Sequence, residues 1–371
     1  MKTKIISSID RAMLRRGFNT ATFFIKPHAA KNGSVIKFID QFLLKHGITV
    51  RQTKTIKSNE IKESGLIDKH YLLNSTAANV LPIEQKITDQ TRIEVREKFN
   101  LNWDEGVQSE KIINAKQAKD LFKLNPGELN RLWEENSSMK ISSTGFYMAK
   151  MMIKGQEKYV INGFYPSLKE KYTADDAEIR LYVVSFPNMD WSKFRELIGK
   201  TNPEEALKEL ATGIESIRGI LAKEASEYGL EMTYQDNAVH ASASPLEAMY
   251  EGMWTNTDNS KDPLGSILKR LGLSDKALCT WINNPVVEFE GKEDRVFNHL
   301  ELKNTNEAAA ILFEMYVMET AKRYIESDII DADDFLEQGD LVKISILSFL
   351  ERLQNSEELV LSLNHILKNN N

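Results

Sequence analysis

A short apolar run that stops at a proline constrains the fold of this chain more than any other sequence feature. Residues 22–26 read Thr-Phe-Phe-Ile-Lys and are followed at once by Pro27. The run predicts a buried strand, and Lys26 then stands at the strand's end. After an Asn-Gly turn, apolar residues at helical spacing predict an amphipathic helix that stops at Gly47. Residues 48–55 alternate and predict a second strand, so the chain begins as strand, helix, strand.

The rest of the chain divides into strand and helix patterns without an internal repeat. The apolar run at 179–186 predicts another buried strand, and residues 146–153 and 158–164 predict the two arms of a hairpin. Helical patterns cover 58–73, 82–99, 115–124, 126–135, 191–198, 214–228 and 306–326. A polar linker is predicted at 256–261, with mostly helical sequence after it.

Charge and composition exclude several classes of protein. The 371 residues carry a formal net charge of -6, which does not favour a general surface for nucleic acid or anionic membranes. Cys279 is the single cysteine, so an internal disulfide and a cysteine-based zinc site are both excluded. No apolar run is long enough to cross a membrane. The basic, serine-containing start of the chain resembles either a transit peptide or an ordinary amphipathic helix.

One histidine stands among small residues just before a helix start. The sequence around His240 reads Asn-Ala-Val-His-Ala-Ser-Ala-Ser-Pro-Leu-Glu. Ser244 and Glu247 form a capping box and Pro245 occupies the first helical position, which predicts a helix over 245–254. His240 then lies where a strand turns into this helix, and free N–H groups at the helix start suit a phosphate. The alternative is a histidine that only hydrogen-bonds within the turn.

Eight polar residues, taken in chain order, resemble the active-site motifs of the nucleoside diphosphate kinases. In that family a strand ends in Lys-Pro and a His-Tyr pair closes the nucleotide-clamp helix. A Gly-x-Thr-Asn-Pro stretch, an Arg-Gly pair and an Asn-x-x-His turn follow, with a glutamate eleven residues after the histidine. The matching positions here are Lys26, Tyr71, Arg195, Thr201, Arg218, Asn237, His240 and Glu251.

The resemblance implies that His240 is the nucleophile of a phosphotransferase with ping-pong kinetics. His240 would take the γ-phosphoryl group of a nucleoside triphosphate as phosphohistidine and pass it to a nucleoside diphosphate. Only a neutral imidazole with one free ring nitrogen can attack, and the resemblance assigns Glu251 to hold the other nitrogen. It assigns Lys26 to neutralise the transferring phosphate.

The resemblance also implies a set of nucleotide-binding residues. Arg195, Thr201 and Arg218 would clamp the β-phosphate side. Tyr71 would contact the γ-phosphate region and Asn237 the ribose 3′-hydroxyl. The small residues after His240 leave room for a phosphate, to which Ser242 can donate. Mg²⁺ would arrive with the nucleotide, because the sequence contains no evident carboxylate cage for it. Each residue also has a purely structural interpretation: a solvated surface charge for Lys26, Arg195 and Arg218, a core residue for Tyr71, and a helix cap for Thr201.

A large insertion separates this chain from the family pattern. About a hundred residues, 76–177, lie between the clamp helix and the strand at 179–186, and no aromatic residue follows Tyr71 where the family stacks one on the base. The inserted hairpin offers substitutes for base stacking. These are Phe146, Tyr147, Phe164 and Tyr165.

Two further departures concern the catalytic segment itself. The segments on either side of Arg218 are longer than usual, and a continuous helix at 214–228 could move that arginine. Ala241 and Ala243 replace a glycine and an acidic residue of the family motif. Alanine at the glycine position requires a negative φ.

The sequence therefore predicts an α+β fold. Its core would be a ferredoxin-like antiparallel sheet with covering helices in residues 1–255, interrupted by an inserted α/β subdomain at about 76–177. Residues 256–371 would form an α-helical C-terminal domain. Nucleoside tri- and diphosphates are the expected partners, with no nucleic acid and no membrane. A homo-oligomer is expected, with no assumption of a hexamer, and a cytoplasmic location is favoured over an organelle.

Two alternatives to a nucleoside diphosphate kinase remain open at this point. One is a related kinase that phosphorylates a different acceptor. The other is a catalytically silent nucleotide-binding interaction module, which would not need the nucleophile that His240 provides.

Overall fold

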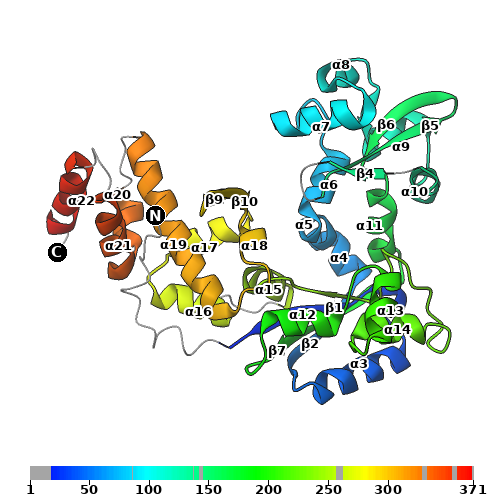
Figure 1. Cartoon of the computed structure of the whole chain (residues 1–371), viewed down its shortest axis with the longest axis horizontal. Coiled ribbons are helices and arrows are strands. Elements are labelled where there is room, and N and C mark those ends of the chain that lie inside the picture. Colours follow the sequence, from blue (N-terminus) through cyan, green and yellow to red (C-terminus); the bar gives the residue numbers. More distant parts are fainter. Residues whose placement is uncertain are drawn as a thin grey trace. The chain divides into compact units, whose positions relative to one another are not determined.

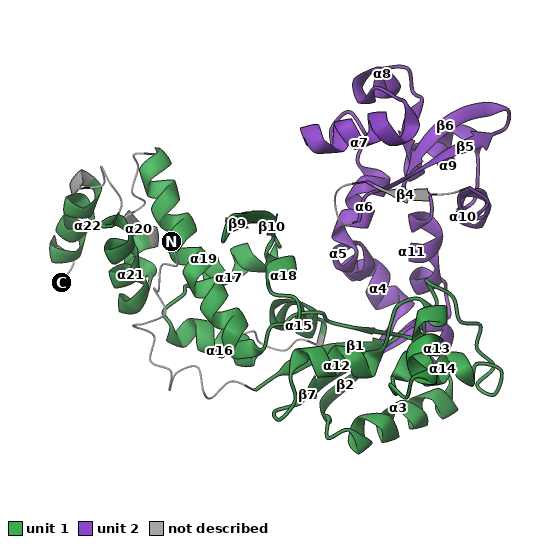
Figure 2. Ribbon diagram, in the orientation of Figure 1, with its two compact units in different colours: residues 1–25, 32–54, 181–371 green, residues 26–31, 55–180 purple. Residues whose placement is uncertain are grey.

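The computed structural model describes residues 18–85, 87–136, 138–141, 145–255, 262–327, 332–352 and 357–369. These residues divide into two compact units (Figure 2). Unit 1 contains the described residues of 1–25, 32–54 and 181–371, and unit 2 contains those of 26–31 and 55–180. The predicted basic N-terminal helix and the predicted linker at 256–261 lie outside the described residues. The predicted domain boundaries stay predictions.

A four-stranded sheet organises the first part of unit 1, in the order β2-β7-β1-β8. Figure 1 labels three of its strands, β1, β2 and β7. The strands are β1 (Thr20–Ile25), β2 (Thr49–Lys57), β7 (Glu178–Ser185) and β8 (Val239–Ala241). β1 and β8 pair antiparallel, with Phe24 opposite His240. Strand β1 is buried along almost its whole length, as its apolar run predicts. The chain is thus a mixed helix-and-strand protein with antiparallel pairing.

Helices of unit 1 hold this sheet and carry several of the predicted site residues. They are α3 (Gly33–Lys45), α12 (Trp191–Ile198), α13 (Pro203–Ala211), α14 (Ile217–Lys223) and α15 (Pro245–Gly252), followed by the 3₁₀ helix η2 (Met253–Thr255). Helix α12 packs against β8 and α15 packs against β1. α15 begins as predicted, because the Ser244 side chain accepts from the Glu247 N–H and Pro245 follows it.

Helix α14 is shorter than predicted. The apolar pattern predicts one helix over 214–228, but the helix covers only Ile217–Lys223. The Ser216 side chain accepts the N–H of Gly219 and so caps the N-terminus, while Gly213 just before it has a positive φ of 91°. The prediction was wrong because helical spacing of apolar residues does not show where a serine competes for backbone N–H groups.

The C-terminal part of unit 1 is mainly helical. Its elements are α16 (Pro263–Arg270), α17 (Asp275–Ile282), β9 (Val286–Phe289), β10 (Lys292–Arg295), α18 (Val296–His299), α19 (Thr305–Ser327), α20 (Ala332–Glu337), α21 (Asp340–Leu350) and α22 (Glu357–Asn369). These elements share one hydrophobic core, which also includes Leu246 and Met249 of α15. Within the described ranges, every helix is too short or too polar to cross a bilayer.

Unit 2 has its own sheet, in the order β3-β6-β5-β4, and its own hydrophobic core. Its strands are β3 (Ile112–Asn114), β4 (Ser138–Lys140), β5 (Tyr147–Ile153) and β6 (Gln156–Ile161). Its helices are α2 (Pro27–Ala30), α4 (Ser58–Ser64), α5 (Leu66–His70), α6 (Leu72–Asn79), α7 (Asp89–Phe99), α8 (Trp103–Gln108), α9 (Ala115–Phe122), α10 (Pro126–Glu134) and α11 (Tyr165–Thr173). The predicted hairpin is present as β5 and β6, which pair antiparallel from Met148 to Ile153.

The helix predicted over 58–73 is interrupted. α4 ends at Gly65, which has a left-handed φ of 61°, and α5 ends at Tyr71. A glycine in the left-handed conformation closes the last turn of a helix, so a single apolar pattern here covers three short helices.

Candidate active site

His240 lies in the middle of β8, the edge strand that pairs with β1. Its imidazole stacks on the ring of Phe24, with ring centroids 4.7 Å apart and an interplanar angle of 29°. The side chain is 17% exposed, so one part of the ring is packed and another part remains accessible. Phe24 therefore supplies the packing surface that the small residues around His240 do not.

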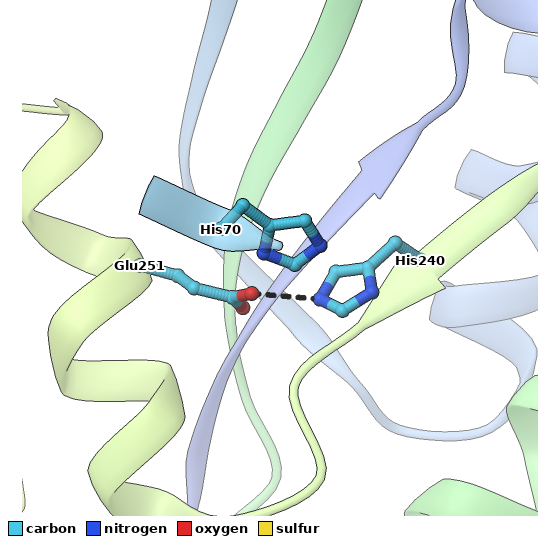
Figure 3. Close-up of side chains that lie close together, drawn as sticks. All are labelled: His70, His240 and Glu251. Carbon is cyan, nitrogen blue, oxygen red and sulfur yellow. Dashed lines mark hydrogen bonds and ion pairs between the residues drawn. The ribbon is translucent and has the colours of Figure 1, made fainter. Parts of the chain in front are cut away.

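Glu251 orients the imidazole. The Nε2 atom of His240 lies 2.8 Å from Oε1 of Glu251, and the two side chains point toward each other from β8 and α15 (Figure 3). The Glu251 side chain is 1% exposed. Its other oxygen, Oε2, accepts from the Ser242 hydroxyl at 2.7 Å. A buried carboxylate needs such partners, because burying an unpaired charge is costly.

Ser242 connects Glu251 to the sheet. It is fully buried, and its hydroxyl lies 2.9 Å from the carbonyl oxygen of Thr22 and accepts the Thr22 N–H at 3.1 Å. A hydroxyl has one proton, so it donates either to Glu251 or to the Thr22 carbonyl at any moment. In this structure Ser242 holds the carboxylate and strand β1 rather than facing a ligand.

The segment before His240 has an unusual backbone. Ala238 has a positive φ of 64° and is fully buried. An alanine in the left-handed region costs about 1 kcal/mol or more and persists only where surrounding contacts fix it. Asn237 supplies such contacts, because its Nδ2 donates to the carbonyl oxygens of Thr201, at 3.0 Å, and Tyr234, at 3.1 Å. The buried Oδ1 of Asn237 has no hydrogen-bond partner within the described part of the chain.

Two arginines bind backbone carbonyls beside His240. Arg195, from α12, donates through Nη1 to the carbonyl oxygens of Ala241 and Ser242. Arg218, from α14, is buried and donates to the carbonyl oxygens of Gly199 and Val239, each at 2.8 Å. Both guanidinium groups therefore fix the strand that carries His240 and bring positive charge to it.

Gly199 makes the Arg218 contact possible. It has a φ of 90°, and a Cβ atom at this position would lie 2.3 Å from the Ser216 hydroxyl. Only glycine fits between α12 and the cap of α14.

Glu247 belongs to this site and was not predicted to. Its Oε2 accepts the N–H of Ala243 at 2.6 Å, which places a second carboxyl beside the His240 segment. Burial, together with the Glu251 carboxyl, raises the pKa of Glu247 to about 8, against the opposing effects of the Ala243 N–H and the Arg195 guanidinium. The sequence carried a signal for it, because Glu247 was identified as the second residue of the capping box. That interpretation gave it a structural role only.

The nine predicted site residues fall into two groups. Unit 1 brings together the six side chains described above, and places Thr201 on an exposed turn whose carbonyl Asn237 binds. Lys26 and Tyr71 belong to unit 2, where Lys26 is buried at the start of α2 and the Tyr71 ring packs edge-on against His70 and Tyr172. The grouped residues of unit 1 are Arg195, Arg218, Asn237, His240, Ser242 and Glu251.

Two sequence expectations can be settled from local geometry. Ala241 is part of the extended strand β8, so alanine fits where the family motif has glycine. Two of the aromatic residues suggested for base stacking serve the interior of unit 2 instead: Phe146 is in its core, and Tyr165 is buried and donates its hydroxyl to Asp68. For these two residues the stacking prediction was wrong, because hairpin position alone does not distinguish an inward from an outward ring.

Comparisons with known proteins found matches among solved structures. No protein-family model matches the chain, and no curated protein matches it. Among solved structures, the chain is similar to an orthorhombic crystal form of the Aquifex aeolicus nucleoside diphosphate kinase, with 15% identity and a TM-score of 0.28. It is also similar to an NDP kinase from Pyrobaculum aerophilum, with 17% identity and a TM-score of 0.29. Each match covers 64% of this chain and 94% of the other.

Proposed function

We propose that this chain is a nucleoside diphosphate kinase-like phosphotransferase that works through phosphorylated His240. It would move the γ-phosphoryl group of a nucleoside triphosphate to a nucleoside diphosphate in two half-reactions. The observation that carries the proposal is the 2.8 Å contact between His240 Nε2 and a buried glutamate. This contact engages Nε2, and we assign the attack on phosphorus to the other ring nitrogen, Nδ1.

The first half-reaction needs no proton transfer. The lone pair of Nδ1 forms a bond to the γ-phosphorus while the bond from that phosphorus to the β,γ-bridging oxygen breaks. The diphosphate leaves with the electron pair. The proton on Nε2 stays shared with Glu251, which stabilises the positive charge that develops on the ring. The second half-reaction reverses these steps with a different diphosphate.

The charge that phosphoryl transfer needs would come from cationic residues and magnesium. We assign Lys26 to the transferring phosphate, Arg195, Thr201 and Arg218 to the β-phosphate side, Tyr71 to the γ-phosphate region and Asn237 to the ribose. Ser242 would act chiefly through Glu251. Mg²⁺ would be held by the nucleotide's phosphates, which fits the donor set here: both oxygens of Glu251 already accept hydrogen bonds from the protein.

The strand order supports the proposed fold. Taken in chain order, the four strands of the unit 1 sheet are β1, β2, β7 and β8, and their spatial order is β2-β7-β1-β8. The first and third strands lie at the centre, which is the arrangement of a ferredoxin-like sandwich with a βαββαβ chain path. We propose a homo-oligomer in the cytoplasm, formed through a free sheet edge or the C-terminal helices, with no assumption of a hexamer.

One observation favours the silent-module alternative. Arg195 and Arg218 donate guanidinium N–H groups to backbone carbonyls. In a phosphate clamp these N–H groups would instead have to face the nucleotide. If the arginines keep these contacts when nucleotide binds, the chain would bind nucleotide without transferring phosphate.

Incubation with γ-labelled ATP tests the proposal. We expect acid-labile, base-stable label on the wild-type protein and none on His240→Asn, because a histidine is the acceptor. His365→Asn, which changes an exposed histidine of α22, should keep the label. Chasing the labelled protein with GDP, CDP or dTDP should then release the label as the triphosphate. Label that GDP, CDP and dTDP do not release would indicate another acceptor, and nucleotide binding without label would establish the silent module.

A further inference from the structure

Two glutamates on one face of α15 hold the segment that carries His240. Glu247 and Glu251 are four residues apart, so their side chains project from the same side of the helix. Glu251 binds His240 Nε2 and the Ser242 hydroxyl, and Glu247 binds the Ala243 N–H at 2.6 Å. The chain that leaves β8 is therefore fixed at three points by carboxyl groups of a single helix.

Arg195 fixes the same segment from the other side. Its guanidinium donates to the carbonyl oxygens of Ala241 and Ser242, while Glu247 takes the next N–H along the chain. Backbone groups on both sides of Ser242 are thus held by polar side chains from two different helices. Removing Glu247 would take away the acceptor of the Ala243 N–H. Of these two side chains, Arg195 alone would then hold the backbone on the two sides of Ser242.

We propose that Glu247 is a positioning residue for His240, which holds the backbone after β8 so that the imidazole presents Nδ1 to a phosphoryl group. This inference rests on the proposed phosphotransfer activity. It concerns a residue to which the family resemblance assigned no role. Ala243 stands where the family motif has an acidic residue, and Glu247 returns a carboxyl to the backbone of that same position.

The surroundings of Glu247 predict how it titrates. Burial, the Glu251 carboxyl and Glu301 together raise its pKa to about 8, against the opposing effects of the Ala243 N–H and Arg195. Near neutral pH Glu247 therefore keeps its proton while its Oε2 accepts the Ala243 N–H. When Glu247 ionises above that pKa, it adds a second negative charge close to where the γ-phosphate must approach. Phosphorylation should therefore slow on the alkaline side.

Two variants separate the hydrogen bond of Glu247 from its ionisation. Glu247→Gln keeps an oxygen that accepts the Ala243 N–H but cannot ionise, and Glu247→Ala removes the acceptor. Glu231→Ala, which changes an exposed glutamate of the same unit, is the matched control. We expect Glu247→Ala to form phosphohistidine at least about tenfold more slowly, since small displacements of a reacting group cost that much or more. Glu247→Gln should react within about threefold of wild type near neutral pH and lose the alkaline fall.

Histidine NMR gives a readout that does not require activity. In wild-type protein labelled at histidine, with His240→Asn used to assign the signal, the His240 ring resonances should show an inflection near the pKa of Glu247, about 8. Glu247→Gln should abolish that inflection and Glu231→Ala should keep it. The proposal is overturned if Glu247→Ala reacts as fast as Glu231→Ala, or if Glu247→Gln leaves the His240 titration unchanged. If the wild type never becomes phosphorylated, the proposed function fails, and the NMR titration alone decides the positioning role.

Discussion

The carboxylate of Glu251 engages one ring nitrogen of His240, Nε2. Its two oxygens have different partners, the imidazole on one side and the Ser242 hydroxyl on the other. A carboxylate that is 1% exposed cannot turn toward water to satisfy a lost bond. Its orientation, and that of the histidine, therefore depends on Ser242 as much as on α15.

Ser242→Ala tests this dependence. The variant removes the hydroxyl that donates to Glu251 Oε2 and that accepts the Thr22 N–H. We expect it to lower the free energy of unfolding by about 1–3 kcal/mol, the usual cost of leaving a buried polar group unsatisfied. Phosphohistidine formation should fall as well, because the variant loses one of the contacts that fix the Glu251 carboxylate. Urea unfolding and γ-labelled ATP measure the two effects.

Ser226→Ala is the control for this change. Ser226 is exposed, so its substitution should leave both stability and labelling within experimental error. Equal behaviour of the two variants would show that Ser242 does not hold Glu251.

Spacing along the chain predicted that His240 and Glu251 lie together, but not how the residues around them are held. The eleven-residue spacing from His240 to Glu251 identified the pair, and the structure joins them by a hydrogen bond. The partners of Arg195 and Arg218 could not be predicted. They are backbone carbonyls of residues close in space and distant in sequence, and any residue type supplies the same carbonyl. The contact of Glu247 with the Ala243 N–H, four residues away, could not be predicted either, because every residue except proline supplies such an N–H group.

At the scale of single elements, apolar patterns located most strands and helices. They did not locate the positions at which helices are interrupted. The strand at the start of the chain, the hairpin of unit 2 and α12 lie where the sequence predicts them. The long helices predicted around Gly65 and Ser216 are broken instead. A break depends on one residue's conformation or capping bond, which an average over a window of apolar residues does not register.

Gly199→Ala tests the junction between α12 and α14. A Cβ at this position would overlap the Ser216 hydroxyl, the group that caps α14 and so helps to place Arg218. We expect a loss of about 2–4 kcal/mol in the free energy of unfolding, from the left-handed backbone conformation and the overlap together. Urea unfolding measures the change.

Gly213→Ala provides a matched control, because Gly213 has nearly the same φ as Gly199, 91°. A Cβ atom at position 213 would have no neighbouring atom within 4 Å. This variant should lose only about 1 kcal/mol, the backbone contribution alone. If both alanine variants lose the same stability, the overlap with Ser216 is not what requires glycine at 199.

At the scale of unit 1 as a whole, α15 serves two parts of the molecule. Glu247 and Glu251 face the strand of His240, while Leu246 and Met249 belong to the hydrophobic core of the C-terminal helices. The helices after residue 262 therefore stabilise the helix that orients the proposed nucleophile. Charge and composition could not predict this, because the sequence carries no motif in that region and its residues contribute through packing.

Asn304→Ala tests how the C-terminal helices are joined to the sheet. Asn304, just before α19, accepts from Asn19 Nδ2 at 2.8 Å and from the Trp191 N–H at 3.1 Å, and donates to Asp190 at 2.9 Å. Alanine removes all three bonds, and we expect a loss of about 2–3 kcal/mol in the free energy of unfolding. Hydrogen exchange should show reduced protection at the start of α19 and of α12, because the Asn304 side chain links these two helix starts.

Asn188→Ala is the control. It alters an exposed amide in the loop before α12 and should change neither the free energy of unfolding nor the hydrogen exchange. Equal protection in the two variants would mean that hydrophobic packing alone, without this asparagine network, couples the C-terminal helices to the sheet.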